Sequence, residues 1–247
     1  MRIDVAFTPD ADGAAAKGAA VAIVIDVLRA TTTIACALEQ GYRRVLACGE
    51  VEHARELAER LGAGAVLAGE RACVKPEGFH LGNSPREFTG APLGETLVLT
   101  TTNGTRAIVA AAAHAEAVLI GSLVNLTPCA AAAGRLARAA GGNVLVQCAG
   151  IKGAFTMDDA YTAGRFVTEL AVWLSEWERS DAARAAEAVA GSFASAGDGL
   201  AASQSARNLH GVGLDEDVRF CARESVLDLV PRVGDLDAGV ALIEAAT

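Results

Sequence analysis

The fold of this chain is decided by the stretch Val24-Ile25-Asp26-Val27-Leu28-Arg29-Ala30-Thr31-Thr32-Thr33. Residues 20–25 are apolar and rich in Val and Ile, which is typical of a strand that is buried on both faces in a parallel sheet. Apolar residues then recur at helical spacing as far as Tyr42, with Thr31 to Thr33 in the cap and first-turn positions. The pattern predicts a strand that ends at Asp26, a turn that carries Arg29, and a helix.

Two interpretations of this turn stay open. An acid, an arginine and a helix N-terminus can together hold a metal ion and an anion. An Asp at the end of a strand is also a common helix-capping residue, with Arg29 as its surface partner. The residues at the other strand ends decide between the two.

Strands and helices alternate along the chain. The expected strands cover residues 3–7, 20–25, 44–47, 65–68, 96–99, 118–120 and 144–146, and the expected helices cover residues 31–41, 51–61, 107–113, 128–140 and most of 154–190. We also expect a small-residue loop at 8–18, a turn-rich part at 191–213 and an edge strand at 226–230. The alternation predicts an α/β protein with a parallel sheet covered by helices. We expect one domain over residues 1–247, or a division into a helical C-terminal part near residues 153–195.

Composition excludes several classes of protein. The 247 residues carry a formal net charge of -9 without a basic stripe, which disfavours a nucleic-acid binder. No uncharged apolar run reaches the roughly 20 residues of a membrane span, so no membrane association is expected. Asp4 lies where a signal peptide would be apolar, which predicts a cytoplasmic protein. The six cysteines form no CxxC pair and the four histidines no HExxH motif, so a zinc site is not indicated.

Polar residues follow several of the expected strands. They are Asp26 and Arg29, Glu70 and Arg71, Asn103-Gly104-Thr105-Arg106, Ser122, Lys152 and, a few residues later, Asp158 and Asp159. Because the loops after the carboxyl ends of parallel strands share one side of a sheet, we expect these residues to meet at one crevice. Carboxylate oxygens favour a divalent cation such as Mg²⁺, while guanidinium groups and helix N-terminal amides bind phosphate-like oxygens.

A long connection without periodicity covers residues 72–94. A connection of this length is typical of a binding loop or lid, and it adds Asn83, Ser84 and Arg86 to the candidates. Two minor hypotheses are a nucleophile at Cys148, beside a glycine at a strand end, and a proton donor at His80 in the loop.

Each piece of the candidate site also has a purely structural explanation. Asn103-Gly104 can be a turn with a helix cap, and Asp158-Asp159 can be a charge pair that complements a helix dipole. Glu70-Arg71 can be an exposed pair. The sequence has no GxSxG elbow and no GxxxxGK[ST] loop, so a serine hydrolase and a P-loop protein are not indicated. The case for function rests on the expected co-location of all the pieces.

Several separate motifs resemble, in the right order, those of one family. They are Asp26-Val27-Leu28-Arg29-Ala30-Thr31-Thr32-Thr33, Gly69-Glu70-Arg71, Gly78-Phe79-His80-Leu81-Gly82-Asn83-Ser84-Pro85, Thr102-Asn103-Gly104-Thr105, and Cys148-Ala149-Gly150 with Asp158-Asp159. The chain is similar in these motifs to the 2-phosphosulfolactate phosphatases. The likeness covers about residues 21–165 and continues more weakly over residues 211–231.

The resemblance implies a three-layer α/β/α fold and a magnesium-dependent phosphomonoesterase. Such an enzyme removes phosphate from 2-phospho-3-sulfolactate, a step on a route to coenzyme M. We expect Mg²⁺ ligands among Asp26, Glu70, Asp158 and Asp159, and catalytic roles for Asp26, Arg29 and Asn103. Substrate contacts are expected from Thr31, Thr32, Arg71, Asn83, Ser84, Arg86, Gly104, Thr105, Arg106 and Lys152. We favour metal-bound water over Asp26 as the nucleophile, since Asp26 lacks the DxD spacing of phosphatases that form an aspartyl phosphate.

Two other functions stay open. One is a phosphatase for another small phosphorylated acid or a sugar phosphate, and the other is a non-catalytic module that binds a phosphorylated metabolite. A nucleotidase is less favoured, because it needs a stacking platform and only 4% of the residues are aromatic. The sequence also leaves open whether the chain forms a homo-oligomer.

Overall fold

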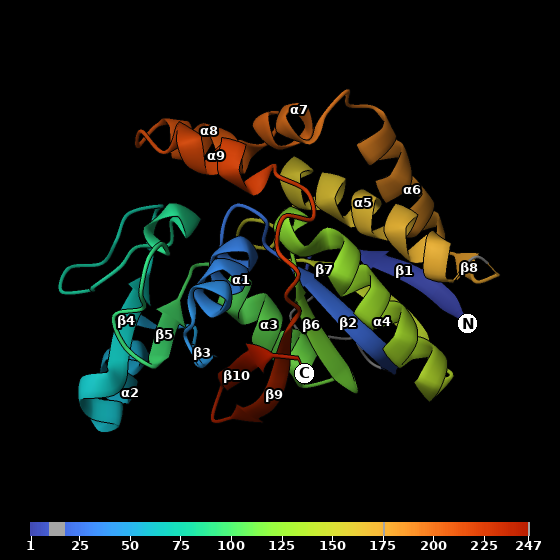
Figure 1. Ribbon diagram of the computed structural model, residues 1–247. Helices are drawn as coiled ribbons and strands as arrows, with labels where there is room; N and C mark the ends of the chain where they lie inside the picture. The colour runs from blue at the N-terminus through green and yellow to red at the C-terminus, as the bar shows by residue number, and fades with distance from the viewer. Residues whose placement is uncertain (10–17, 175, 247) are drawn as a thin grey trace.

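The strands of the computed structural model, which describes residues 1–9, 18–174 and 176–246, form one ten-stranded sheet (Figure 1). They are β1 Arg2–Ala6, β2 Ala19–Ile25, β3 Arg44–Ala47, β4 Ala65–Gly69, β5 Thr96–Thr100, β6 Ala117–Gly121, β7 Asn143–Cys148, β8 Glu178–Arg179, β9 Pro231–Asp237 and β10 Val240–Ala245. Their order across the sheet is β4-β5-β3-β10-β9-β6-β2-β7-β1-β8. Two parallel blocks, β4-β5-β3 and β6-β2-β7-β1-β8, are joined by the antiparallel hairpin β9–β10.

Helices cover both faces of this sheet. They are α1 Ala30–Gln40, α2 Val51–Leu61, α3 Gly104–Ala112, α4 Leu126–Ala140, α5 Met157–Trp173, α6 Asp181–Gly191, α7 Ala196–Ala201, α8 Gln204–His210 and α9 Asp215–Cys221. Strand β2 shows why the core has two sides: Ile23 packs in a cluster with α4 and α5, whereas Val24 packs in a second cluster with α1 and α3. Every residue of β2 is buried as a result. The predicted three-layer α/β/α fold with a mostly parallel sheet is confirmed.

The C-terminal hairpin differs from the sequence-based expectation. Residues 226–230 form no strand, so the predicted edge strand is wrong. The hairpin β9–β10 forms just after them and lies between β3 and β6 inside the sheet, where it joins the two parallel blocks. The chain reverses at Ala238 and Gly239, whose φ angles of 46° and 77° are those of a tight hairpin turn.

The segment expected to be turn-rich, residues 191–213, contains the short helices α7 and α8. Each begins at a serine whose hydroxyl accepts a backbone N–H: Ser195 accepts from Asp198, and Ser203 accepts from Ala206. The small residues that suggested turns are therefore partly helix caps. We call residues 196–221, which hold α7 to α9, the cap, and they lie at the top of Figure 1. Of the expected loop at 8–18, residues 10–17 lie outside the described part of the chain.

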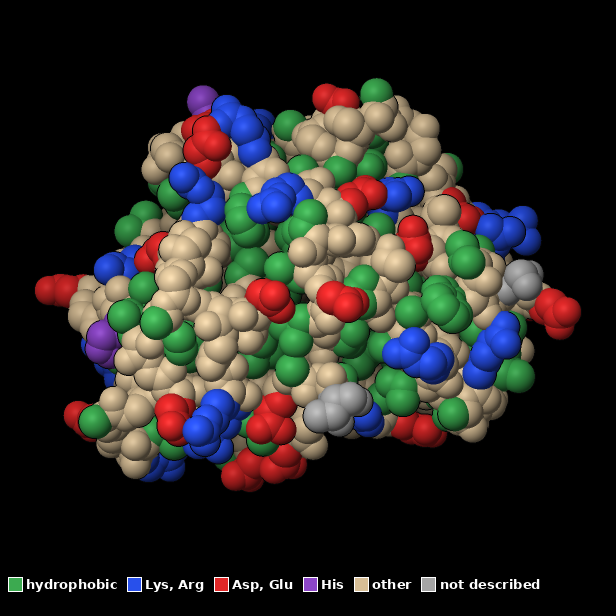
Figure 2. Space-filling model, in the orientation of Figure 1, with side chains coloured by type: hydrophobic (Ala, Val, Ile, Leu, Met, Phe, Trp, Pro, Cys, Tyr) green, Lys and Arg blue, Asp and Glu red, His purple; other side chains and the backbone are tan. Residues whose placement is uncertain are grey.

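Two general expectations bear on the surface. Among the described helices, none combines the length and the apolar character that crossing a membrane requires. On the face shown in Figure 2, acidic and basic side chains are interspersed, and no basic stripe crosses it.

Candidate active site

A cavity of about 680 Å³ lies at the carboxyl ends of β2, β4, β5 and β7, on the side covered by the cap. It is lined by Asp26, Leu28, Arg29, Glu70, Arg71, Ala72, Cys73, Asn83, Thr102, Asn103, Ile151, Lys152, Ser205, Asn208, Gly211 and Val212. A position at the carboxyl edge of a parallel sheet is the usual place for a ligand in this class of fold. Residues from both parallel blocks and from the cap therefore meet at one site.

The turn between β2 and α1 is held by its own threonines. The Thr31 hydroxyl donates to the Asp26 carbonyl at 2.9 Å, and the Thr32 hydroxyl donates to the Val27 carbonyl at 2.9 Å. Both threonines are fully buried and lie outside the cavity lining. The Asp26 carboxylate, which accepts the Ala30 N–H at 3.3 Å, does line the cavity. Thr31 and Thr32 thus shape the turn, and Asp26 is the side chain that the turn presents.

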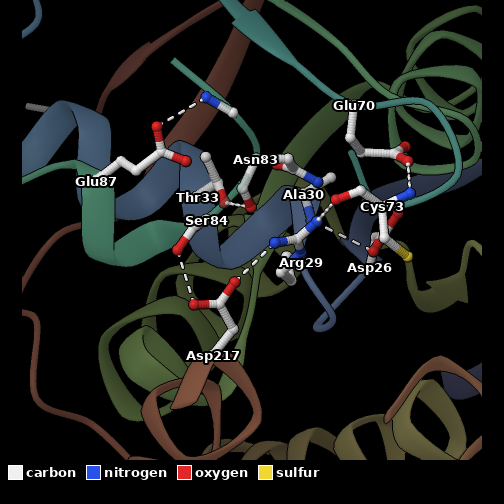
Figure 3. A network of polar contacts seen from close by, with 11 residues as sticks. Asp26, Arg29, Ala30, Thr33, Glu70, Cys73, Asn83, Ser84, Glu87 and Asp217 are labelled. Atoms are coloured by element: carbon white, nitrogen blue, oxygen red, sulfur yellow. Dashed lines mark hydrogen bonds and ion pairs between the residues drawn. The ribbon is translucent and has the colours of Figure 1, made fainter. Parts of the chain in front are cut away.

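Arg29 is buried beneath the cap and paired there. Its Nη1 lies 2.7 Å from Oδ2 of Asp217 on α9, and its Nη2 donates to the Cys73 carbonyl at 3.1 Å (Figure 3). The other oxygen of Asp217 accepts the Ser84 hydroxyl at 2.7 Å. Ser84 therefore contacts Asp217 and does not line the cavity.

Glu70 and Arg71 are fixed by the strand ends beside them. The Glu70 carboxylate accepts the N–H and the hydroxyl of Thr102, both at 2.8 Å, and the N–H of Cys73 at 2.9 Å. The Arg71 guanidinium donates to the Gly49 carbonyl at 2.7 Å and to the Thr100 hydroxyl at 2.9 Å. Both side chains line the cavity, so they are not the exposed pair that the structural alternative described.

Asp158 and Asp159 lie buried in the first turn of α5, and each does something different. Asp159 accepts the N–H of Val27 at 3.1 Å and the N–H of Gly150 at 2.9 Å, so it joins the turns that follow β2 and β7. Asp158 keeps one buried oxygen, Oδ1, without a hydrogen-bond partner among the described residues. A buried carboxylate oxygen without a partner is costly, which is a reason to expect a cation or a proton beside it.

Burial raises the pKa of three carboxyl groups, those of Asp26, Asp158 and Asp159. Burial, and after it repulsion by Asp158 and Glu70, raises the pKa of Asp26 to about 7 against the lowering effect of the Ala30 N–H. Burial also raises the pKa of Asp158, and that of Asp159 is raised well above its usual range by burial and by repulsion from Asp158. Several carboxyl groups whose ionised forms are disfavoured therefore lie near Asp26, and a bound cation would stabilise those ionised forms.

The carboxylates near Asp26 fit a Mg²⁺ ion that takes only one or two of its ligands from the protein. Over residues 1–9, 18–174 and 176–246, no three His, Cys, Asp or Glu side chains gather closely enough to form a complete metal site. Mg²⁺ usually uses one or two carboxylates and takes its other ligands from water and substrate phosphate. Two carboxyl groups match that preference: Asp158, whose Oδ1 has no hydrogen-bond partner among the described residues, and Asp26, whose pKa is raised.

The structure brings together only part of the predicted set. The predicted residues that line the cavity are Asp26, Arg29, Glu70, Arg71, Asn83, Asn103 and Lys152, whereas Asp158 and Asp159 are buried outside the lining. Arg86 is exposed away from it, and Arg106 is an exposed partner of Glu50 at 3.1 Å. Thr105 is buried, with its N–H and hydroxyl both bonded to Thr101. Gly104 lies directly behind Asp26, since a Cβ there would come within 2.7 Å of Asp26 Oδ2.

The long connection at residues 72–94 is a packed wall, which argues against the lid hypothesis. The backbone N–H groups of His80 and Leu81 both donate to the Leu67 carbonyl, at 3.0 and 3.1 Å. The Thr33 hydroxyl donates to the Asn83 carbonyl at 2.9 Å, and the ring of Phe88 is buried in the core. The loop is therefore tied to the sheet and to α1 along much of its length.

The two minor hypotheses fare differently from the main one. Cys148 is fully buried outside the cavity lining, and burial raises the pKa of its thiol well above the usual range, which disfavours a nucleophile. His80 uses Nδ1 to accept the Leu67 N–H at 3.0 Å and also lies outside the lining. Neither side chain is placed to act on a ligand in the cavity.

Sequence reasoning missed the contribution of the cap. Ser205, Asn208, Gly211 and Val212 line the cavity from α8 and the turn after it, and Asp217 pairs with Arg29 from α9. The acidic run Asp215-Glu216-Asp217 was visible in the sequence. Cys221 lies one helical turn after Asp217 and so on the same face of the helix, and that spacing could have singled out Asp217 from its neighbours.

These features define the class of the protein: an α/β protein with a cavity at the carboxyl edge of its sheet that is lined by both cationic and carboxylate side chains. The family model for 2-phosphosulpholactate phosphatase matches residues 7–235, and the chain belongs to this family.

Relatives agree with this assignment over nearly the whole chain. A probable 2-phosphosulfolactate phosphatase of Thermus thermophilus is 42% identical over 221 residues, which cover 87% of this chain and 90% of the relative. One from Deinococcus radiodurans is 39% identical, with 89% and 91% covered. One from Carboxydothermus hydrogenoformans is 35% identical, with 100% and 98% covered.

Proposed function

We propose that this chain is a magnesium-dependent phosphomonoester hydrolase that converts 2-phospho-3-sulfolactate and water into 3-sulfolactate and inorganic phosphate. Water attacks the phosphorus atom, and the bond between phosphorus and the C2 oxygen of the substrate breaks. The observation that carries the proposal is the meeting of three cations with the carboxylates Asp26 and Glu70 around one cavity, in a chain of this family.

The cations of the cavity match the charges of the proposed substrate. Phosphosulfolactate carries a phosphate, a carboxylate and a sulfonate, and Arg29, Arg71 and Lys152 line the cavity. Arg71 is held by backbone and hydroxyl oxygens, so it is oriented before any ligand binds. No aromatic side chain of the described residues lines the cavity, which disfavours a nucleotide.

The roles of the residues follow from their positions. Arg29 would hold oxygens of the phosphoryl group, and its contacts strengthen as charge moves onto those oxygens in the transition state. The Asn103 side chain, whose Oδ1 accepts the Lys152 N–H at 3.0 Å, would donate from its amide nitrogen to the same group. Lys152 and Arg71 would bind the carboxylate and the sulfonate.

The carboxylates would hold the cation. Asp26 and Asp158 are the proposed ligands, with Glu70 and Asp159 as neighbours that add negative charge. When bound, Mg²⁺ supplies charge neutralisation at the phosphoryl oxygens and polarises the phosphorus atom. The backbone N–H groups that Glu70 and Asp159 accept keep those two side chains fixed while the substrate binds.

The test is phosphate release from a panel of phosphomonoesters, with Mg²⁺ and with a chelator. The panel holds 2-phospho-3-sulfolactate, 2-phosphoglycerate, a sugar phosphate and a nucleotide. We expect release to be fastest from phosphosulfolactate and to stop when the chelator is added. Preference for the sugar phosphate would indicate a broader phosphatase, and binding without release from any compound would indicate a non-catalytic module.

A further inference from the structure

We propose that Asp217, on the cap helix α9, is a positioning residue that orients the Arg29 guanidinium toward the phosphoryl group. The inference rests on the proposed function in one respect, namely that Arg29 binds a phosphoryl or phosphate oxygen. Asp217 itself lies outside the cavity lining and acts through Arg29.

The geometry fixes the guanidinium at two of its nitrogens. Arg29 is 3% exposed and Asp217 is fully buried, and the 2.7 Å contact joins Nη1 to Oδ2. Nη2 is held at the same time by the Cys73 carbonyl at 3.1 Å, on the opposite side of the group (Figure 3). A guanidinium has five N–H donors, so two anchors leave three for a ligand. Since Arg29 lines the cavity, those donors can be used there.

Stability alone is a weak reason for this pair. Removing two charges from water costs several kcal/mol per ion, so a buried ion pair contributes little net stability and is often replaceable by apolar side chains. Asp217 nevertheless lies 188 positions from Arg29 in the sequence, on a helix outside the sheet. A buried charge that contributes little to stability is better explained by the orientation it imposes.

The carboxylates of the cavity supply the physical need for an anchor. Arg29 lies close enough to Asp26 to lower the pKa of that carboxyl group, and Glu70 is bonded to the same Cys73 whose carbonyl holds Arg29. Without Asp217, these two anions remain as counter-charges near the guanidinium, which would turn toward them. Such a turn would occupy the proposed cation ligands and remove donors from the phosphoryl position. Asp217 prevents this by offering a closer anion on the other side.

Asp217 also reaches the wall of the cavity through its second oxygen. The Ser84 hydroxyl donates to Oδ1 at 2.7 Å, and the neighbouring Asn83 lines the cavity with a buried Oδ1 that has no partner among the described residues. Two kinds of role can therefore be separated by substitution. Ser84→Ala removes the link to the wall and keeps the ion pair, whereas Asp217→Asn weakens the ion pair and keeps a group able to bond Ser84.

The experiment compares Asp217→Asn with Glu216→Gln, a matched loss of charge on the exposed side of the same helix. We expect Asp217→Asn to lower kcat by roughly tenfold to a hundredfold with an unchanged circular dichroism spectrum, and Glu216→Gln to match the wild type. Ser84→Ala should cost less than Asp217→Asn. If Asp217→Asn does not fold, Asp217→Glu serves in its place, because it keeps the negative charge but displaces the guanidinium. This variant should also lower kcat.

A chemical rescue separates orientation from a structural role. Arg29→Ala opens space beside Asp217, and added guanidinium ion should restore part of its turnover. The double variant Arg29→Ala with Asp217→Asn should show no rescue, and its turnover without guanidinium should equal that of Arg29→Ala. Equal rescue by guanidinium in both proteins would overturn the proposal. So would losses of turnover from the two substitutions that multiply in the double variant. A normal kcat in a folded Asp217→Asn or Asp217→Glu protein would overturn it as well.

Orthophosphate binding, measured by calorimetry, keeps the test independent of turnover. We expect Asp217→Asn to lower the affinity for orthophosphate about tenfold when Arg29 is present. In the Arg29→Ala background the same substitution should lower it less than about twofold. If the wild type hydrolyses no member of the substrate panel but this coupling is found, the proposed function fails and the positioning role stands. Orthophosphate affinity that is independent of residue 217 would refute the positioning role whatever the enzyme hydrolyses.

Discussion

The carboxyl edge of the sheet and the cap contribute to the same cavity by different means. At the edge, side chains are fixed by main-chain groups: Glu70 accepts two backbone N–H groups, and so does Asp159. The cap consists of helices of six and seven residues, and it reaches the site through side-chain contacts such as Asp217 with Arg29. The position of the edge side chains is therefore set by the main chain of the fold, whereas the cap acts on the site through a few side-chain contacts.

The largest expected effect comes from the edge. Asp26→Asn should lower turnover by roughly a thousandfold, because it removes a proposed cation ligand and the negative charge that the turn after β2 places in the cavity. Phosphate release at saturating Mg²⁺ measures the effect. Asp228→Asn, the same change at an exposed position outside the cavity, is the control and should be near the wild type. Turnover within tenfold of the wild type in Asp26→Asn would show that the edge does not carry the chemistry.

A second test displaces the edge without changing its charges. Gly104→Ala places a Cβ 2.5 Å from the Ala30 Cβ and 2.7 Å from Asp26 Oδ2, so the turn after β2 must move. We expect turnover to fall by roughly a hundredfold and the free energy of unfolding by about 1–3 kcal/mol. Gly191→Ala, where the added Cβ meets open space at the end of α6, should leave both unchanged. Normal turnover in Gly104→Ala would mean that the position of Asp26 is not critical.

The third test separates binding from chemistry. Lys152→Ala should raise KM roughly tenfold with little change in kcat, because Lys152 is proposed to grip the carboxylate or sulfonate of the substrate. Lys75→Ala makes the same change on an exposed lysine outside the cavity and should have no effect. A fall in kcat at constant KM would instead place Lys152 among the groups that act on the phosphoryl oxygens.

The smallest expected effect is on stability. Burial, together with repulsion from Asp158 and Glu70, raises the pKa of Asp26 to about 7, and a bound cation should stabilise its ionised form. Mg²⁺ at about a hundredfold above its dissociation constant should raise the wild-type Tm by roughly 5–10 °C. The increase should vanish in Asp26→Asn, while calcium-free and magnesium-free buffers give the baseline for both. An equal increase in both proteins would place the cation elsewhere.

The same contrast explains how much the sequence could predict. The residues of the edge follow strands whose apolar runs are long and regular, so Asp26, Glu70 and Asn103 could be located at one side of the sheet in advance. The hydrogen bonds of Thr31 and Thr32 could not, since a hydroxyl in a turn serves equally well to bind a ligand or to fix the backbone.

The cap and the hairpin escaped prediction for physical reasons. Helices of six and seven residues have too little periodicity to stand out from the Gly and Ser residues around them, and they are stable through tertiary packing. The pairing of Arg29 with Asp217 depends on where the cap docks, which no local pattern encodes. The insertion of β9–β10 between β3 and β6 is likewise a long-range arrangement that strand propensity does not specify.

A crystal structure with Mg²⁺, 3-sulfolactate and orthovanadate would show the positions of the cation, the phosphoryl analogue and Arg29 together. We expect the metal between Asp26 and Asp158, the vanadate on the N–H groups of Arg29 that Asp217 and Cys73 leave available, and Arg29 still bonded to Asp217. We also expect the carboxylate and sulfonate of the product at Arg71 and Lys152. Metal or vanadate bound away from the carboxyl edge of the sheet would contradict the roles proposed for these residues. So would a complex in which Arg29 is bonded to Asp26 in place of Asp217.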